Sequence, residues 1–144
     1  MSVLNRMSAQ LKIASWDICS SEDEIAELMK YSIIDIPREY LEIIKEKTEI
    51  EICINAEKYL RIWGAKGCVE MNEAYSIQRY IPNSLAFADD ECCNVLLFLK
   101  GHDGDGIYLA SLGDLSVDDM IFIADSLDAF LVKGKGIEIF NSIY

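Results

Sequence analysis

The stretch VLLFL, residues 95–99, is apolar at five consecutive positions. A strand with two apolar faces is normally covered on both sides, so this stretch predicts a central strand of a sheet. Another apolar run, residues 85–88, precedes it and predicts a neighbouring strand. On the other side, a turn rich in glycine and aspartate at residues 101–106 leads to two further predicted strands, residues 107–110 and 120–123.

Two helices are predicted before these strands. Residues 21–24 have the Ser-x-x-Glu form of a capping box, which begins a helix with Ile25, Leu28 and Met29 on its inner face. Pro37 begins a second helix, because its fixed φ suits the first helical turn.

The pattern then changes to strands. Apolar and polar side chains alternate at residues 50–54 and again at residues 59–63, which predicts two half-buried strands. Residues 69–78 fit a short helix that ends before Pro82, since the residue preceding a proline avoids the helical region.

The C-terminal part predicts one late helix. Asp125 or Ser126 caps this helix and Gly134 ends it, while the tail at residues 137–144 is expected to add an edge strand. Helices come first in this scheme, a run of strands follows, and one helix comes late. That order predicts a single α+β domain over residues 1–144 with a mainly antiparallel sheet.

Composition excludes several classes of protein. The chain has 144 residues, 51% of them apolar, which fits one folded domain and excludes a disordered chain. The sequence contains no apolar run of the ~18 residues that a membrane span needs, so we expect no membrane segment. It has 25 acidic side chains against 13 basic ones, whereas a protein that binds nucleic acid through phosphates needs a basic surface.

The negative charge is concentrated in the C-terminal part. Residues 87–144 hold 11 acidic and 3 basic side chains, a net charge of −8 out of −12. One interpretation is a solvated surface that keeps the protein soluble. The other is a surface that attracts a basic partner and speeds its docking. Charge alone does not separate the two.

Cysteine content and the N-terminus indicate the cytoplasm. Polar residues interrupt residues 1–16 every few positions, so we expect no signal peptide there. The five cysteines are odd in number and form no C-x-x-C pair, which favours a reduced protein. No role is assigned to the adjacent Cys92 and Cys93.

No constellation in the sequence predicts catalysis. His102 is the only histidine and lies in a turn, where a solvated side chain is the usual finding. The aspartates at residues 103–106 have the wrong spacing for a calcium loop, and Ile107 stands where such a loop has a ligand. Residues 133–136 lack the spacing of a phosphate-binding loop. We therefore expect no enzyme, no cofactor and no metal site.

Four groups of residues are informative through their order and spacing along the chain. They are IPREYLEII (36–44), YLRIW (59–63) leading to VEMNEAY (69–75), IPNSLAFADD (81–90) and IADSLDAFL (123–131). Together, over about residues 20–133, they resemble the SUKH superfamily, which includes fungal regulators of cell-wall glucan synthesis and many bacterial immunity proteins. One departure is ECC at residues 91–93, where members often carry glycines.

The resemblance implies helices packed beside a curved sheet, and no catalysis. It implies an immunity protein that binds and blocks a cognate toxin domain of the nuclease or deaminase type. A regulatory or scaffolding protein of the cell-wall synthesis type is the alternative, and a small enzyme is the third hypothesis. In the first case the partner is a basic toxin domain. The sequence assigns neither the toxin nor an oligomeric state.

The predicted partner-binding residues combine the acidic excess with aromatic side chains near the strands. Aromatic residues dominate the energetics of many interfaces, although tryptophan and tyrosine at such positions are more often part of the core. The set is Asp89, Asp90, Glu91, Asp103 and Asp105, with Trp63 and Tyr75 as aromatic anchors.

Overall fold

Seven strands form one antiparallel sheet in the computed structural model, which describes residues 2–101 and 104–143. The strands lie side by side in chain order, so β1 and β7 are the edges. Their bounds are β1 Leu11–Asp17, β2 Thr48–Ile54, β3 Lys58–Ile62, β4 Ser84–Asp89, β5 Asn94–Gly101, β6 Gly104–Ser111 and β7 Ile121–Ala124. The structure therefore confirms the predicted α+β class and the antiparallel sheet.

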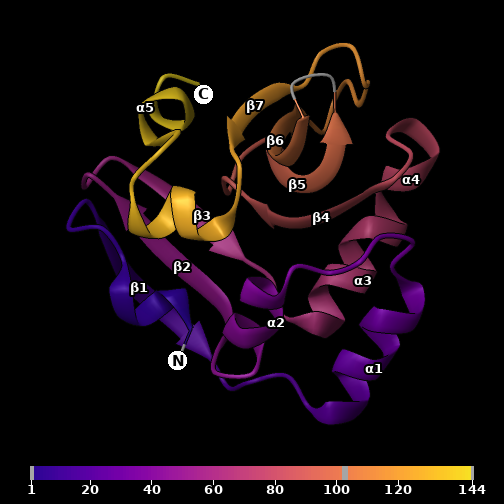
Figure 1. The fold of residues 1–144 in the computed structure, drawn as a ribbon, viewed down its shortest axis with the longest axis horizontal. Helices are drawn as coiled ribbons and strands as arrows, with labels where there is room; N and C mark the ends of the chain where they lie inside the picture. The colour runs from indigo at the N-terminus through magenta and orange to yellow at the C-terminus, as the bar shows by residue number, and fades with distance from the viewer. Residues whose placement is uncertain (1, 102–103, 144) are drawn as a thin grey trace.

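The helices pack beside this sheet. α1 lies against α3, α3 and α4 lie against β4, and α5 packs near β7 (Figure 1). Within the described residues, no helix is long and apolar enough to cross a membrane. The bounds are η1 Val3–Arg6 (a 3₁₀ helix), α1 Glu22–Tyr31, α2 Arg38–Ile44, α3 Ala65–Ala74, α4 Ile77–Tyr80, η2 Asp128–Val132 (a π-helix) and α5 Ile137–Asn141.

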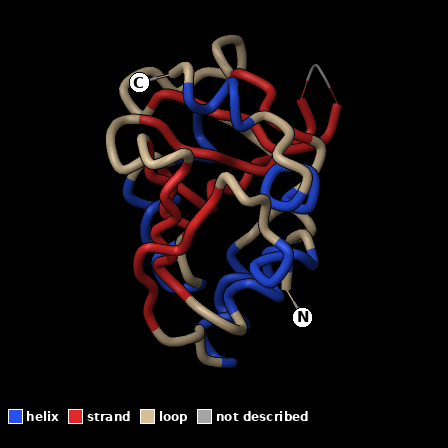
Figure 2. The backbone as a smooth tube through the Cα atoms, turned by 90° about the vertical axis from the view of Figure 1, so that its left-hand side faces the viewer, coloured by secondary structure: helices blue, strands red, loops and turns tan. Residues whose placement is uncertain are grey.

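The sheet is narrowest between β3 and β4. These strands pair only through Arg61 with Asp89 and Ile62 with Ala88, whereas β5 and β6 pair along their whole length. Figure 1 shows β4–β7 curling away from β1–β3 at this junction, and Figure 2 shows the same bend from the side. The chain between β3 and β4 forms α3 and α4, which fill the space that the bend opens.

A buried side chain replaces the missing strand partner of β4. Asn72 of α3 is fully buried, and its Nδ2 donates to the carbonyl oxygen of Ala86 over 2.8 Å. Its Oδ1 accepts from the Ala86 N–H over 3.0 Å and from Gln78 Nε2 over 2.9 Å. Buried backbone groups need such partners, so Asn72 fixes α3 to β4.

Aromatic side chains form the centre of the core. The rings of Phe87 and Phe98 stack with centroids 4.1 Å apart, and the Tyr40 ring lies 5.8 Å from each. Tyr40 is fully buried and its hydroxyl donates to the carbonyl oxygen of Trp63 over 2.7 Å, so burial raises its pKa well above the usual value. The predicted central strand is confirmed, because residues 95–99 are all buried.

The capping box that predicts α1 is confirmed. Ser21 Oγ accepts from the Glu24 N–H over 3.1 Å, and Glu24 Oε1 accepts from the Ser21 N–H over 2.8 Å. The predicted inner face is correct for Leu28 but wrong for Met29, which is 57% exposed. α1 packs on α3 rather than in the centre of the core, so it buries a narrower stripe than its sequence suggests.

The predicted helix at residues 69–78 is placed wrongly. α3 begins at Ala65 and ends at Ala74, and the left-handed Ser76 (φ 51°) separates it from α4. The earlier start depends on distant residues: Ser20 Oγ accepts from the Ala65 N–H, and Glu49 Oε2 accepts from the Gly64 N–H. These long-range caps leave no local signal in the sequence.

Both ends of the chain also differ from the prediction. The 3₁₀ helix η1 and a strand, β1, precede the two predicted helices, and the irregular register of β1 against β2 explains why the sequence shows no alternation there. The tail forms α5 instead of an edge strand. Gly136 adopts φ 85° and α5 then buries Ile137 and Phe140. The late helical region is therefore two short helices.

We predict that Asn72→Leu lowers the free energy of unfolding by about 2–4 kcal/mol. Leucine has a similar size but leaves the buried Ala86 N–H without its acceptor, while the Cys68 thiol still donates to the Ala86 carbonyl. Urea denaturation followed by circular dichroism measures the change. Glu73→Ala, an exposed position of the same helix, is the control and is expected to stay within about 0.5 kcal/mol. Equal effects of both substitutions would contradict the prediction.

Candidate functional site

Two adjoining depressions lie where β3, β4 and α3 meet, and we call them together the Arg61 groove. Their volumes are about 560 and 360 Å³, and they share Arg61, Met71 and Asp89. Among the described lining residues are six carboxylates and two cationic side chains. The carboxylates are Asp17, Glu24, Glu49, Glu70, Asp89 and Glu91, and the cations are Arg61 and Lys66.

Trp63 and Asp89 line the groove and are hydrogen-bonded to each other. Trp63 follows β3 directly and is only 2% exposed. Its indole Nε1 donates to Asp89 Oδ2 over 2.8 Å, while Asp89 Oδ1 accepts from the Glu91 N–H over 2.7 Å. The ring of Trp63 is therefore covered, and both oxygens of Asp89 have partners within the protein.

Asp90 organises the turn between β4 and β5. Its Oδ1 accepts from the N–H groups of Cys92 (3.1 Å) and Asn94 (3.0 Å), and its Oδ2 accepts from Asn94 Nδ2 (2.8 Å). Glu91 adopts φ 59° in this turn, the left-handed region that glycine favours. The departure from the SUKH resemblance at residues 91–93 thus keeps a glycine-like backbone without glycine. Cys92 and Cys93 are exposed in the same turn.

Arg61 bridges two carboxylates. Its Nη2 lies 3.3 Å from Glu51 Oε2 and 3.7 Å from Glu91 Oε2. Burial and the hydrogen bond shared with Glu51 raise the pKa of Glu91 to about 7, although Arg61 opposes this shift. Glu91 is therefore half-protonated near neutral pH, and the charge of the groove changes in that range.

Glu49 lies under the start of α3. Its Oε2 accepts from the Gly64 N–H over 2.9 Å, where a carboxylate also favours the helix dipole. A side chain at Gly67 would displace the Glu49 carboxylate, since its Cβ would lie 2.7 Å from Glu49 Oε2. Burial raises the pKa of Glu49, and the Gly64 N–H partly offsets this effect.

Tyr75 is the exposed aromatic residue of the groove. It caps the C-terminus of α3, is 41% exposed and lines the smaller depression together with Glu91. An exposed tyrosine beside carboxylates offers a flat apolar surface and a hydroxyl to a protein partner. The groove thus presents carboxylate acceptors, the guanidinium of Arg61 and the aromatic surface of Tyr75. These groups are suited to binding a polar partner.

The structure brings together four of the seven predicted partner-binding residues. Trp63, Tyr75, Asp89 and Glu91 line the Arg61 groove, with Asp90 in the adjacent turn. Asp105 lines a different cavity beside α2. The predicted Asp103, like His102, falls outside the described residues.

Sequence reasoning missed Glu49, Glu51 and Arg61. The pair of Glu51 and Arg61 had a signal, because the two residues are directly opposite one another in the β2–β3 hairpin. Glu49 had none, because its contact with Gly64 depends on the position of α3. Among the described residues, no group of three or more His, Cys, Asp or Glu side chains is arranged to hold a metal ion.

Comparison of the sequence with models of known protein families finds a match to one family. The model of the SMI1 / KNR4 family (SUKH-1) matches residues 19–133. No curated protein matches the chain.

We predict that Glu91→Gln flattens the pH dependence of stability between about pH 4.5 and pH 7. The folded state keeps a proton on Glu91 up to about pH 7, whereas the unfolded chain releases it near 4.5. Over this window the folded state binds more protons, so Glu91 makes the free energy of unfolding fall as pH rises. Glutamine mimics the protonated form and removes that contribution.

Urea denaturation at a series of pH values measures this effect. The difference between the variant and the native protein is expected to grow in favour of the variant as pH rises to about 7 and then to stay constant. Asp118→Asn, in the exposed loop after β6, is the matched control. Parallel curves for Glu91→Gln and the native protein would contradict the assignment.

Proposed function

The chain belongs to the SMI1 / KNR4 (SUKH-1) family, and on that premise we propose that it is a non-catalytic immunity protein. It neutralises a cognate bacterial toxin domain by binding it directly. The toxin is of the nuclease or deaminase type, and the two proteins meet in the cytoplasm. The five cysteines, all within the described residues, are free thiols, which supports a reducing compartment.

The charge of the chain is the observation that carries this proposal. The 144 residues carry a net charge of −12, and −8 of it falls in the last 58 residues. Nucleases hold phosphates in basic clefts, so an acidic protein competes for the same surface. Opposite charges also raise the association rate, which matters for an inhibitor that must act before the toxin does.

The Arg61 groove is the face that we propose for this contact. Tyr75 is 41% exposed and supplies an aromatic anchor. Beside it lies Glu91, which is paired with Arg61 and carries a full negative charge only above about pH 7. Asp89, Asp90 and Trp63 support these two residues, because their polar atoms are bonded within the protein. Of the predicted partner-binding residues in and beside the groove, we therefore assign direct contact chiefly to Tyr75 and Glu91.

We predict that co-expression of this protein rescues growth of bacteria that produce the toxin domain encoded beside its gene. Rescue by binding requires a stable complex, which isothermal titration calorimetry measures on the two purified proteins. A protein that leaves toxicity unchanged and forms no complex with this domain would contradict the proposal. The alternative, a regulator of cell-wall synthesis, would then be favoured by altered glucan content in a deletion strain of the host.

We predict that Tyr75→Ala weakens the toxin complex about tenfold, because truncating an aromatic anchor costs more than 1 kcal/mol at an interface of this kind. At pH 8, above the pKa of Glu91, Glu91→Gln is expected to slow association at low salt and to leave it nearly unchanged at high salt. Surface plasmon resonance at two salt concentrations separates these effects. Asp118→Asn removes one charge at a residue that does not line the groove, and it is the control. If all three variants bind alike, the groove is not the contact face.

A further inference from the structure

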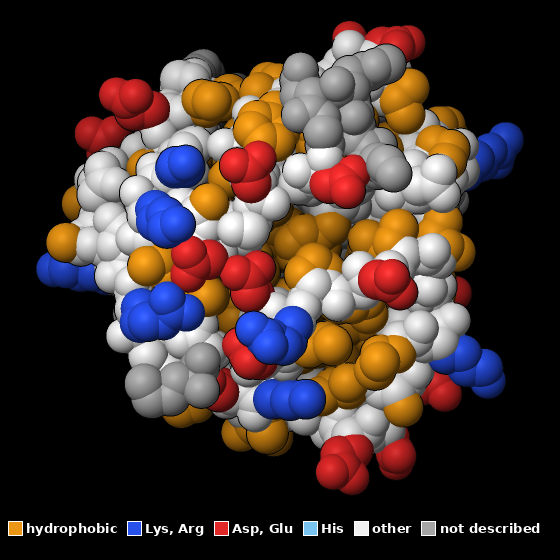
Figure 3. Space-filling view, in the orientation of Figure 1, with side chains coloured by type: hydrophobic (Ala, Val, Ile, Leu, Met, Phe, Trp, Pro, Cys, Tyr) orange, Lys and Arg blue, Asp and Glu red, His pale blue; other side chains and the backbone are white. Residues whose placement is uncertain are grey.

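A second cavity of about 490 Å³ opens on the face formed by α2, the start of β4, the middle of β5 and the segment before η2. We call it the α2–β5 cavity. Its lining contains none of the residues that define the Arg61 groove. Figure 3 shows it as an apolar hollow near the centre of the molecule. A volume of this size is typical of sites that enclose a ligand or a partner's side chain.

The floor of the cavity is apolar and rigid. Phe98, Leu99 and Leu127 are 5%, 7% and 1% exposed, and they lie at its base. Phe98 is held by its stack with Phe87. Gly106 lines the wall, where a Cβ would lie 2.6 Å from the Ala124 carbonyl, so the wall lies directly against β7. The floor is therefore formed before any partner arrives.

The rim of the cavity carries only negative charge among its described residues. Asp35, Glu39, Asp105 and Asp125 come from four separate segments of the chain and line the same opening. Asp35, Asp105 and Asp125 are exposed, whereas Glu39 accepts a hydrogen bond from the Asp128 N–H over 3.3 Å. Four carboxylates on one apolar opening repel each other, and a cation between them relieves that repulsion.

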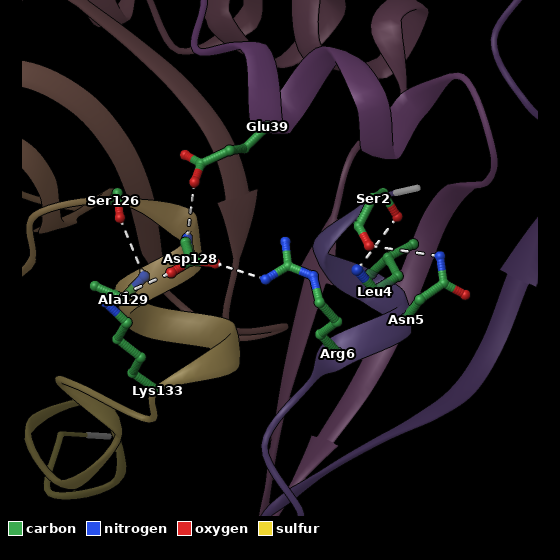
Figure 4. A network of polar contacts seen from close by, with 9 residues as sticks. All are labelled: Ser2, Leu4, Asn5, Arg6, Glu39, Ser126, Asp128, Ala129 and Lys133. Atoms are coloured by element: carbon green, nitrogen blue, oxygen red, sulfur yellow. Dashed lines mark hydrogen bonds and ion pairs between the residues drawn. The ribbon is translucent and has the colours of Figure 1, made fainter.

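The cations beside η2 are paired with Asp128, which does not line the cavity. Arg6 Nη1 lies 3.1 Å from Asp128 Oδ1, and Lys133 Nζ lies 3.8 Å from Asp128 Oδ2 (Figure 4). Asp128 points toward Arg6 while Glu39 binds the backbone of the same residue. These contacts fix the start of η2. Among the described residues, they leave the rim carboxylates of the cavity without a counter-charge.

We propose that the α2–β5 cavity receives a lysine or arginine side chain from a partner protein. The aliphatic stem lies on Phe98, Leu99 and Leu127, and the charged end meets Asp35, Asp105 and Asp125. Long basic side chains combine an apolar stem with a charged tip, which is the complement of an apolar floor under an acidic rim. The inference rests on the proposed function for the identity of the partner, a basic toxin domain, but not for the chemistry of the cavity.

The chemistry is tested with the peptide Ac-Arg-Arg-NH₂ and methyl NMR of the full chain. Binding is expected to shift the methyl signals of Ile34, Leu99 and Leu127 in a saturable way, because these side chains line the cavity. The uncharged peptide Ac-Gln-Gln-NH₂ is expected to give no such shifts. Shifts that are absent, or that are spread evenly over the surface, would overturn the proposal.

A pair of variants separates the cavity from the general acidity of the protein. Asp105→Asn with Asp125→Asn keeps the shape of the rim and is expected to weaken peptide binding about fivefold to tenfold, as loss of two partly exposed ion pairs implies. Asp118→Asn with Asp119→Asn removes the same charge from the exposed loop before β7 and is expected to leave binding unchanged. Equal losses in both variants would overturn the proposal.

Two further outcomes are distinguishable. If spermidine saturates the same methyl shifts at a lower concentration than the peptide, the cavity takes a small polycation and the protein-partner assignment is wrong. If the peptide binds as expected but Asp105→Asn with Asp125→Asn leaves toxin binding and rescue intact, the assignment to the toxin interface is wrong. Failure of the toxin complex itself would count against the proposed function and would leave the peptide result unchanged.

Discussion

The hydrogen bonds between the Asn72 side chain and the backbone of Ala86 are the constraint on which the rest of the structure depends. β4 pairs with β3 over only two residue pairs, so its backbone needs another partner before the sheet continues to β5. A primary amide carries donor N–H groups and an acceptor oxygen side by side, so it bonds both the carbonyl and the N–H of Ala86 as a neighbouring strand would. Gln78 extends the link, since its Nε2 donates to the Ser84 carbonyl and its Oε1 accepts from the Tyr31 hydroxyl. Two bonded amides, Asn72 and Gln78, thus tie α1, α3, α4 and β4 together.

Both candidate surfaces follow from that junction. Because α3 is fixed against β4, its C-terminal end brings Met71 and Tyr75 beside the β4–β5 turn and forms one wall of the Arg61 groove. Behind the same junction, Tyr40 joins α2 to the chain after β3 through the Trp63 carbonyl and packs on Phe87 and Phe98. This packing sets the distance between α2 and β5, and the α2–β5 cavity occupies the space that remains between them. The groove and the cavity therefore share one framework and differ in composition.

The sequence predicts those parts of the fold that depend on local chemistry. The capping box at Ser21 and the apolar run at residues 95–99 are signals of this kind, because each acts within a few residues. The start of α3 and the helical tail are not, because they depend on Ser20, on Glu49 and on the packing of Phe140. The same division holds for the site. Acidic excess and family motifs indicate which segments carry charge, but the pairing of Glu91 with Arg61 and Glu51 exists only once three strands meet.

A count of acidic residues also overstates the charge that a partner can reach. The carboxylate oxygens of Asp89 and Asp90 accept hydrogen bonds from Trp63 and from the turn before β5. One oxygen of Glu49 accepts a hydrogen bond from the start of α3. Glu91 holds its proton to about pH 7. The bonded carboxylates of Asp89 and Asp90 hold the fold together, so neutralising them changes stability and binding at once. Charge that serves recognition must be sought where the carboxylates are exposed and unpaired within the described residues, as around the α2–β5 cavity. The carboxylates behind the net charge of −12 thus fall into two groups. Some are bonded within the protein and serve the structure, and others are exposed and available to attract a partner.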